Sequence, residues 1–508
     1  MQTMQIAAND AAPDAMHQDS VHNTAADSHQ TPNTVHHAQE ETHASTGHDT
    51  GHHGNMSYWQ NMGTGPLLLN ILPFVGLLLM IAILPLIPKV DHWWHQNKNK
   101  LMVAAVCGIA GVAFYLMPTG DWHKVLHTYT EYAAFIALLA SLFIISGGIY
   151  ISGPFAGFPH VNTMFLALGA ILANLMGTTG ASMLLIRPLI TANKPRRHKT
   201  HLMVFFIFIV ANCGGLLTPL GDPPLYMGFL RGVPFEWTLR LFPEWLVMVG
   251  MLLLVFLALD TYLFTREELE TKTSLTHIVQ SGAEGKKLKI EGARNLGFLA
   301  LVVGVILTSG YLVHPFLKTN YGLSNADIGA QLFQVVALSI ITAISFFTTP
   351  ARIREANAFS FEPILEVACI FVGIFGAMIP ALTILEAKGS MLPLNTAWQY
   401  FWVTGGLSGF LDNAPTYLTF VTLAASKNGV PTAPLTEFTA QFPELLAAIS
   451  AGAVFMGALT YIGNGPNFMV KTIAEHSNIK MPSFGGYILW SFSVLLPLLV
   501  IITFLNFI

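Results

Sequence analysis

Two aspartates lie inside long apolar segments, where a carboxylate is energetically costly. Asp222 belongs to the stretch 218–225, which reads TPLGDPPL, and Asp412 lies at the centre of the apolar segment 395–426. A carboxylate at membrane depth normally faces a polar cavity and marks a functional site. Proline lacks an N–H and its ring clashes with the preceding turn, so 218–225 predicts an interrupted helix. Broken backbone at that depth must line protein or water rather than lipid.

The stretch around Asp222 has a counterpart in the second half of the chain. Residues 218–227 align without gaps on residues 460–469, which places Asp222 opposite Asn464. The two segments share Thr, Gly, Pro and Met at equal positions. The second segment therefore predicts a second broken helix, in which a carboxamide takes the place of the carboxylate.

A second pair of short segments repeats in the same way. Residues 174–178 align on residues 412–416, which places Asn174 opposite Asp412. Each segment lies at the polar centre of a long apolar run, and we expect each run to enter the membrane, turn and return to the same side. Each half of the chain thus carries one carboxylate and one carboxamide, with their positions exchanged.

These groups suit a monovalent cation, because hard cations bind carboxylate, amide, hydroxyl and free backbone carbonyl oxygens. We predict two related ion sites with one titratable carboxylate each. An Asp that holds either H⁺ or Na⁺, but not both, is the minimum device for exchange. The first site consists of Asn174, Thr178, Thr179, Ser182 and Asp222, and the second of Asp412, Asn413, Thr416, Asn464 and Asn467. The accessory candidates are Asn212, Thr218, Glu366, Thr460 and Lys471.

Structural roles stay open for several of these residues. Asp222 would also serve as an N-cap of the second half-helix, since Asp satisfies free N–H groups there. Asp412 would likewise brace its turn. The hydroxyl groups of 178–182 would also allow close helix packing. Lys471 and Glu475 are spaced four residues apart, which is typical of a helix-surface pair.

The composition defines a membrane protein. Of the 508 residues, 53% are hydrophobic and 10% are charged, and the mean hydropathy is +0.55. Soluble domains are about 25% charged, so we expect an all-α polytopic membrane protein. Its three cysteines lie in apolar runs, and no C-x-x-C pair is present. No phosphate loop or nucleotide motif is present either, which argues against ATP-driven transport. We predict a transporter with no cofactor, no nucleic-acid partner and no enzymatic activity. An intramembrane aspartyl protease would need paired acids that share a proton. Here Asp222 and Asp412 lie in different kinds of segment and each has its own Asn counterpart, which argues against a protease.

Residues 1–65 differ from the rest, because they contain no Lys or Arg and hold nine of the 19 histidines. Such a composition cannot build a core and predicts a disordered tail. His-rich tracts bind zinc, nickel or copper, so a weak metal site is an alternative to a merely solvated tail. Its candidate ligands are His36, His37, His52 and His53.

Lys and Arg cluster in alternate connections, and cytoplasmic connections carry the excess of these residues. The basic connections are 89–100, 194–201, 265–295 and 351–354. We expect them in the cytoplasm, with the N-terminus outside and the protein in the cell (inner) membrane. The expected helices are 66–88, 101–117, 131–152, 242–264, 296–316, 331–348, 362–386 and 485–506, with hairpins at 161–192 and 395–426 and broken helices around 222 and 464.

This order predicts two inverted repeats, 66–264 and 296–508, joined by a cytoplasmic linker at 265–295. Each repeat has a re-entrant hairpin and a broken helix. Inverted repeats with discontinuous helices are typical of secondary transporters, whose sites lie near the midplane.

Four motifs give the chain a family resemblance: 174–189, 218–225, 411–418 and 460–469. Together they resemble NhaD-type sodium/proton antiporters, in a superfamily with arsenite permeases and with citrate and dicarboxylate carriers. The resemblance implies an inverted-repeat transporter, often a homodimer with a scaffold and a moving transport domain. In the dicarboxylate carriers the hairpin tips carry Ser-Asn-Thr motifs, which are not kept here.

The leading hypothesis is therefore antiport of Na⁺ or Li⁺ against H⁺ across the lipid bilayer. The alternative is a cation-coupled carrier of citrate, a dicarboxylate or an arsenite-type anion. The second tip carries an extra carboxylate at Asp412. It would repel a di- or tricarboxylate, which favours a cation as the substrate.

Overall fold

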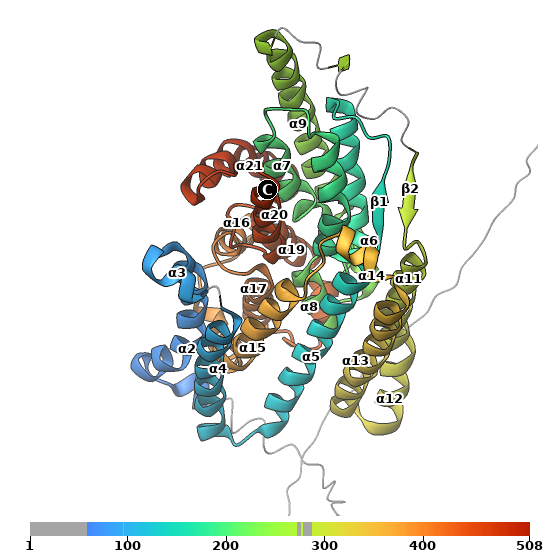
Figure 1. The fold of residues 1–508 in the computed structure, drawn as a ribbon. Helices are drawn as coiled ribbons and strands as arrows, with labels where there is room; N and C mark the ends of the chain where they lie inside the picture. The colour runs from blue at the N-terminus through green and yellow to red at the C-terminus, as the bar shows by residue number, and fades with distance from the viewer. Residues whose placement is uncertain (1–57, 95, 272–275, 278–286) are drawn as a thin grey trace, which may run out of the picture. The chain divides into compact units, whose positions relative to one another are not determined.

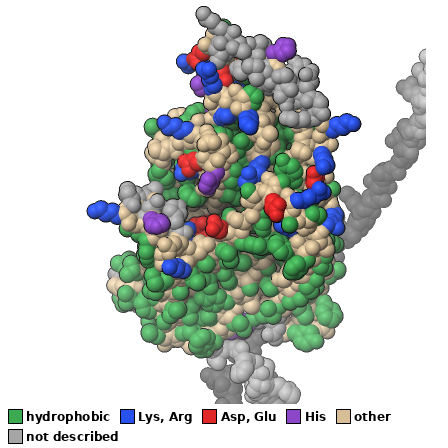
Figure 2. Space-filling model, viewed as in Figure 1, with side chains coloured by type: hydrophobic (Ala, Val, Ile, Leu, Met, Phe, Trp, Pro, Cys, Tyr) green, Lys and Arg blue, Asp and Glu red, His purple; other side chains and the backbone are tan. Residues whose placement is uncertain are grey.

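The computed structural model describes residues 58–508, except for residues 95, 272–275 and 278–286. Ten helices of the described residues are long and apolar enough to cross a membrane. This confirms the predicted all-α polytopic membrane protein. Hydrophobic side chains cover much of the face shown in Figure 2, and most Lys and Arg of this face lie in its upper part. The candidate metal ligands of the tail lie outside the described residues.

The helices follow one another as Figure 1 shows. The first part of the chain contains α2 (Thr64–Ile83), α3 (Pro88–Trp94), α4 (Asn97–Thr119), α5 (Trp122–Ser146), α6 (Pro159–Ala192), α7 (Thr200–Ile209), α8 (Pro223–Leu230) and α9 (Phe242–Thr271). The second part contains α11 (Arg294–Thr308), α12 (His314–Tyr321), α13 (Leu323–Thr348), α14 (Ala351–Ala356), α15 (Glu362–Lys388), α16 (Ala397–Ser408), α17 (Asn413–Lys427), α18 (Thr436–Gln441), α19 (Pro443–Met456), α20 (Gly465–His476) and α21 (Phe484–Asn506).

One predicted helix ends early. The helix expected over 131–152 stops at Ser146, and Tyr150–Ser152 instead form β1, which pairs antiparallel with β2 (Lys289–Glu291). Two consecutive glycines, Gly147 and Gly148, follow Ser146, and Gly is a poor helix former. The strand pair joins the end of α5 to the segment before α11.

Close backbone contacts join α4 to α15. A Cβ on Gly108 would lie 2.9 Å from Cα of Gly373, and a Cβ on Gly111 would lie 2.5 Å from Cα of Ala377. Small residues of this kind let two membrane helices approach closely. Helix α5 packs on α13 in a similar pairing. Of these four helices, α5 contacts α6 and α8, and α15 contacts α17 and α20.

Helix α6 is a hairpin whose two ends meet. Its turn is at Gly177, whose φ of 75° and ψ of 155° are not helical and suit only glycine well. At the base, the carboxamides of Asn162 and Asn193 donate to each other at 3.0 and 2.7 Å. Asn162 also donates to buried Asp260, which pairs with Arg196 at 2.6 Å. The base of this hairpin is thus a buried polar cluster.

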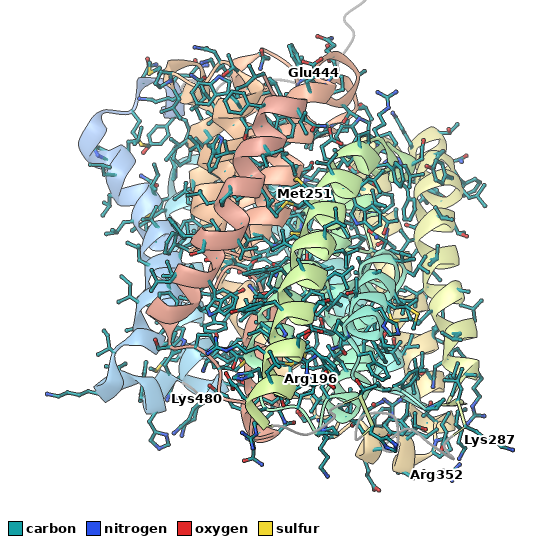
Figure 3. All side chains as sticks on the ribbon, turned by 90° about the horizontal axis from the view of Figure 1, so that it is seen from above. Arg196, Met251, Lys287, Arg352, Glu444 and Lys480 are labelled. Atoms are coloured by element: carbon teal, nitrogen blue, oxygen red, sulfur yellow. The ribbon has the colours of Figure 1, made fainter. Side chains whose placement is uncertain are left out.

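Helices α16 and α17 form the second hairpin. At its base, the Lys427 ammonium donates to the carbonyl of Leu392, 2.5 Å away, so the two arms again end close together. The chain then runs to α19, whose first turn holds Glu444. Figure 3 shows Glu444 at the edge opposite to Arg196, with Lys480, Lys287 and Arg352 on the Arg196 side. The two hairpins therefore begin at opposite ends and point toward each other.

Two helices are broken between the hairpins. The helix α7 gives way to a short 3-10 turn and an irregular stretch before α8, and α19 gives way to an irregular stretch before α20. Asp222 and Asn464 are the N-cap residues of α8 and α20, with φ and ψ of −141° and 145° and of −154° and 139°. The alignment of 218–227 on 460–469 thus pairs residues of equal backbone conformation.

Candidate functional site

Asp222 turns its side chain into the protein. It is the N-cap residue of α8, but its carboxylate makes no capping hydrogen bond to that helix. Only 1% of the residue is exposed. The N-terminus of a helix stabilises a nearby anion through its free N–H groups and its dipole. The simple capping role therefore does not describe Asp222, although the helix still favours its charge.

Three neutral side chains donate to the Asp222 carboxylate. Thr178 Oγ1 donates to Oδ1 at 3.1 Å, and Asn464 Nδ2 donates to the same oxygen at 2.9 Å. Asn413 Nδ2 donates to Oδ2 at 2.5 Å. These donors come from the tip of the first hairpin, the second break and the tip of the second hairpin. All four residues are buried, so three separate segments meet on one carboxylate.

No described Lys, Arg or His forms an ion pair with Asp222. A buried charge without a partner of opposite sign is strongly unfavourable. The three hydrogen bonds offset part of this cost, because hydrogen bonds to a charged acceptor are stronger than neutral ones. Charge balance in this site therefore calls for a bound proton or a bound cation.

Asn174 positions the backbone around this carboxylate. Its Nδ2 donates to the carbonyl of Gly214 at 2.7 Å, and its Oδ1 accepts from the N–H of Leu217 at 2.8 Å. Its own carbonyl accepts from Thr218 Oγ1 at 2.5 Å. Both ends of the Asn174 carboxamide are thus used on the broken segment, and they hold the first hairpin against it.

Equivalent bonds occur in the second half. Thr460 Oγ1 donates to the carbonyl of Gly409 at 2.6 Å, as Thr218 Oγ1 does to that of Asn174. Thr218 and Thr460 are equivalent in the aligned breaks, so Asn174 corresponds to Gly409. The alignment that placed Asn174 opposite Asp412 is therefore three residues out of register, since Asp412 lies three positions after Gly409.

The corrected register pairs Thr178 with Asn413. Both are the first residue of the second arm of their hairpin, because Gly177 and Asp412 interrupt the helix just before them. Both donate to Asp222. The short alignment matched Asn174 with Asp412 because their side chains are chemically similar. In the corrected register the residue after the turn is Thr178 in the first half and Asn413 in the second, and these two residue types do not look alike in the sequence.

Asp412 caps its own helix. Its Oδ1 accepts from the N–H of Ala414 at 3.1 Å, and its carbonyl accepts from Thr416 Oγ1 at 2.8 Å. It makes no hydrogen bond to Asn464 or Asn467 among the contacts of the described residues. The Asp412 side chain thus makes the N-cap contact of α17, and its predicted role in ion binding stays a prediction.

Asn212 and Asn467 join the two breaks. Asn212 Nδ2 donates to Asn467 Oδ1 at 2.6 Å, and Asn464 Nδ2 lies 3.2 Å from Asn212 Oδ1. Asn467 Nδ2 donates at 2.9 Å to the carbonyls of Gly457 and Thr460. The residues of the second predicted ion site therefore have different contacts. Asn413 and Asn464 donate to Asp222, whereas Asn467 holds the backbone beside them.

Several buried oxygens of the described residues have no hydrogen-bond partner, and they include Asn413 Oδ1, Ser182 Oγ and Ser146 Oγ. Asn413 Oδ1 belongs to the same carboxamide that donates to Asp222. Ser182 follows Thr178 by four residues, so it lies on the same helix face. Ser146 was not predicted; its sequence signal is a polar residue before two glycines at the end of an apolar run. Thr179 is half-buried.

Two accessory candidates lie in ion pairs elsewhere. Glu366 accepts from Lys100 at 2.5 Å, and the lysine is buried between α4 and α15. Lys471 pairs with Glu475 at 3.3 Å and lies 5.6 Å from the ring centre of Tyr461. The structure thus has the helix-surface pair that the spacing of 471 and 475 indicated.

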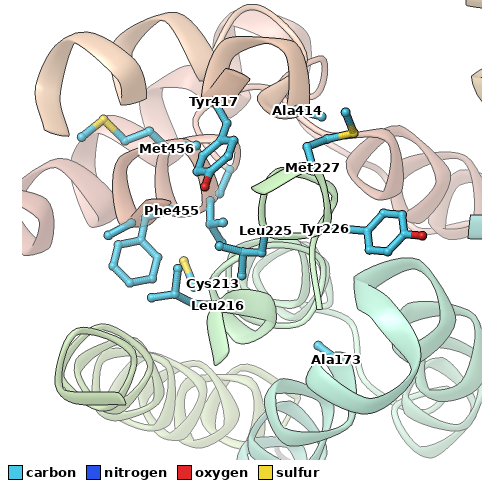
Figure 4. Packing of buried hydrophobic residues seen from close by; sticks show 14 of the residues in the cluster. Ala173, Cys213, Leu216, Leu225, Tyr226, Met227, Ala414, Tyr417, Phe455 and Met456 are labelled. Carbon is cyan, nitrogen blue, oxygen red and sulfur yellow. The ribbon is translucent and has the colours of Figure 1, made fainter. Parts of the chain in front are cut away.

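Apolar side chains surround the breaks. Figure 4 shows Leu216, Leu225 and Phe455 packed close together, with Tyr417 of α17 reaching toward them. All four are buried. Such packing excludes water from the backbone of the breaks, so polar contacts there act in a medium of low dielectric constant. No group of three or more described His, Cys, Asp or Glu residues is arranged to hold a metal ion.

In the part of the chain that the structure describes, ten helices are long and apolar enough to span a membrane, and a buried carboxylate lies at two hairpin tips. This arrangement is typical of membrane transporters. The chain belongs to the family described as "Putative citrate transport", whose model matches residues 64–507. No curated protein matches the chain. The family match supports the predicted transporter superfamily and a multi-pass membrane protein.

Proposed function

We propose that the protein is a secondary antiporter that exchanges Na⁺ or Li⁺ for H⁺, with Asp222 as the residue that binds either ion. The observation that carries this proposal is the buried Asp222 carboxylate, which is held by Thr178, Asn413 and Asn464 without a cationic partner. The three donors are neutral, so the ionised carboxylate needs one positive charge, which either a proton or a monovalent cation would supply. Competition between these ions at one carboxylate couples their movements.

The oxygens around Asp222 suit a hard cation. The two carboxylate oxygens, Thr178 Oγ1 and the unpartnered Asn413 Oδ1 all belong to this group of contacts. Na⁺ takes carboxylate, amide and hydroxyl oxygens, often where a helix is interrupted. When the proton leaves Asp222, the ionised carboxylate is ready to accept Na⁺ from the same side of the membrane.

Movement between the two sides would come from the hairpins. Their bases lie at opposite ends, on the sides where Figure 3 shows Arg196 and Glu444. Their tips meet at Asp222. The equivalent bonds of Thr218 and Thr460 support two repeats of opposite orientation. In such transporters one repeat or bundle rocks against the other around a fixed site. We propose this motion here, with Asp222 open to one side at a time.

The test uses the full chain in proteoliposomes with an imposed pH gradient and a pH-sensitive dye. Addition of Na⁺, without any carboxylic acid, should collapse the gradient, and Asp222→Asn should abolish the response. The same preparation must keep its size-exclusion profile. A wild-type response in this variant would overturn the assignment of Asp222.

The family description favours a second candidate, which is cation-coupled transport of citrate or a related carboxylate. A tricarboxylate needs positive groups, whereas no described Lys or Arg pairs with Asp222. This is why we rank the candidate second. Uptake of labelled citrate that requires Na⁺, together with no Na⁺-driven proton movement in its absence, would establish the second candidate instead.

A further inference from the structure

A basic cavity lies where two predicted spans reach the same edge of the protein. Its volume is about 310 Å³, and its lining includes Lys289, Glu291, Arg294 and Arg352. Arg294 begins the candidate span Arg294–Tyr321, and the neighbouring span ends at Thr348. The cavity therefore lies at the level where a lipid headgroup meets the water.

Figure 3 places this cavity on the basic side of the protein. Arg352 lies at the same edge as Lys287, Arg196 and Lys480. Anionic lipids give the cytoplasmic leaflet a negative surface potential, which attracts basic groups near the ends of spans. A basic edge alone is a general property of membrane proteins. The cavity differs because three cationic side chains line one open groove of the surface.

The charges around the cavity leave a positive excess. Glu291 pairs with Lys289 at 2.7 Å and with Arg352 at 3.4 Å, and the Arg294 guanidinium donates to the Thr348 carbonyl. The hydrogen bond from Lys289, with the charges of Lys289 and Arg352, holds the pKa of the Glu291 carboxyl below its usual range. Three cations and one ionised carboxylate leave two net positive charges, which suits an anion.

A second cavity adjoins the first and is mainly apolar. Its volume is about 410 Å³, it shares Pro350 with the basic cavity, and Phe346, Phe347 and Arg354 line it. Phe347 is 82% exposed. The two cavities meet at Pro350, so a cationic cavity and an apolar cavity lie next to each other.

Arg354 carries donors that the protein does not use. Its guanidinium is buried over the rings of Phe346 and Phe359, at 4.7 and 5.1 Å, and Nη1 donates to the carbonyl of Ile144. Its Nε and Nη2 have no hydrogen-bond partner among the described residues. Buried donors are almost always paired, so these two atoms indicate a ligand with acceptor oxygens.

We propose that the two cavities form one site for an anionic phospholipid of the basic side of the membrane. The phosphate and headgroup would lie between Lys289, Arg294 and Arg352. The part of an acyl chain nearest to the headgroup would lie over Phe346 and Phe347. Arg354 would donate to the oxygens between them. The basic cavity has room for about ten water volumes of 30 Å³, which is enough for a phosphoglycerol headgroup.

Lipid in this site would join parts that are far apart in the sequence. Lys289 lies in β2, which pairs with β1 after α5, and Arg352 lies in α14 after α13. A molecule held by both sides resists their separation, and a ligand that binds only the folded state raises the Tm. Phosphatidylglycerol should therefore stabilise the protein more than phosphatidylcholine does.

The test uses the full chain in detergent, with phosphatidylglycerol or phosphatidylcholine as the added lipid. Native mass spectrometry measures bound lipid, and thermal unfolding measures its effect. Lys289→Gln and Arg352→Gln should each weaken phosphatidylglycerol binding about fivefold. Glu291→Gln should strengthen it, because the variant removes the one carboxylate of the cavity. Lys480→Gln, an exposed basic change at the same edge (Figure 3), should have no effect.

Three results would overturn the proposal. The first is equal binding of phosphatidylglycerol and phosphatidylcholine by the wild type. The second is unchanged binding in both Lys289→Gln and Arg352→Gln, or weaker binding in Glu291→Gln. The third is displacement of the lipid by millimolar inorganic phosphate, which would assign the cavity to a free anion. Opposite effects of the Glu291 and Arg352 variants also separate a binding role from a loss of folding.

Discussion

Replacement of Asn413 by Ala tests the site most directly. The carboxamide donates to Asp222 Oδ2 at 2.5 Å, and its other atom, Oδ1, is a buried oxygen without a partner. The substitution therefore removes one hydrogen bond to the ionised carboxylate and one candidate ligand of Na⁺. A hydrogen bond to a charged group contributes about 1.5–3 kcal/mol. We expect the half-saturating Na⁺ concentration to rise about ten- to a hundredfold.

The assay is Na⁺-driven dequenching of a pH dye in proteoliposomes, measured at constant pH over a range of Na⁺ concentrations. Asn428→Ala is the matched control, because Asn428 lies just after the other end of α17 and donates only to the Ala424 carbonyl in the same helix. The control should keep the wild-type Na⁺ dependence. A half-saturating concentration within twofold of wild type in folded Asn413→Ala would refute our reasoning about the site.

Three further predictions follow from described contacts. Thr178→Val removes a hydroxyl donor to the carboxylate and should raise the half-saturating Na⁺ concentration about tenfold, whereas Thr178→Ser should stay near wild type. Gly221→Ala places a Cβ against a backbone carbonyl of the same break and should lower stability by about 1–3 kcal/mol or more, while Gly250→Ala meets no atom and should not lower the Tm. Asp260→Ala leaves Arg196 buried without its partner and should lower stability by about 3–5 kcal/mol, measured by thermal unfolding in detergent.

The sequence predicts those parts of the fold that depend on local chemistry. Prolines and a glycine around Asp222 exclude a continuous helix, and the structure has a break there. The helix expected before the apolar run 161–192 ends on the cytoplasmic side, and the basic connection 194–201 after the run is expected on that side too. Both flanks on one side predict a turn at the polar centre of the run, and α6 turns at Gly177. Hydropathy, charge and backbone restriction depend on a few neighbouring residues, so they can be predicted from a single sequence.

The contacts of the site depend on tertiary structure instead. The sequence predicts two sites with separate residues, whereas Asn413 and Asn464 both donate to Asp222. Their positions follow from where the hairpin tips end in space, which a short alignment does not specify. The register error arose in the same way: Asn174 resembles Asp412 in chemistry, but the bond of Thr460 shows that its equivalent is Gly409.

Short elements between the long helices were also missed. The strand Tyr150–Ser152 was expected as the end of a helix, and the helices α14 and α18 were not expected at all. These elements have only a few residues, so their local pattern is weak and their packing on neighbouring segments decides their form. Two of the residues that line the proposed lipid site, Lys289 and Arg352, lie in or beside such elements.

The two N-cap positions of the broken helices have a consequence for charge. Asn464 Nδ2 lies 2.9 Å from Asp222 Oδ1, although the two residues occupy equal positions in α20 and α8. Two identical halves would therefore bring two carboxylates into hydrogen-bond contact. Such a pair cannot ionise fully and must share a proton. With an amide in one half, Asn464 donates a hydrogen bond to Asp222 where a second carboxylate would repel it.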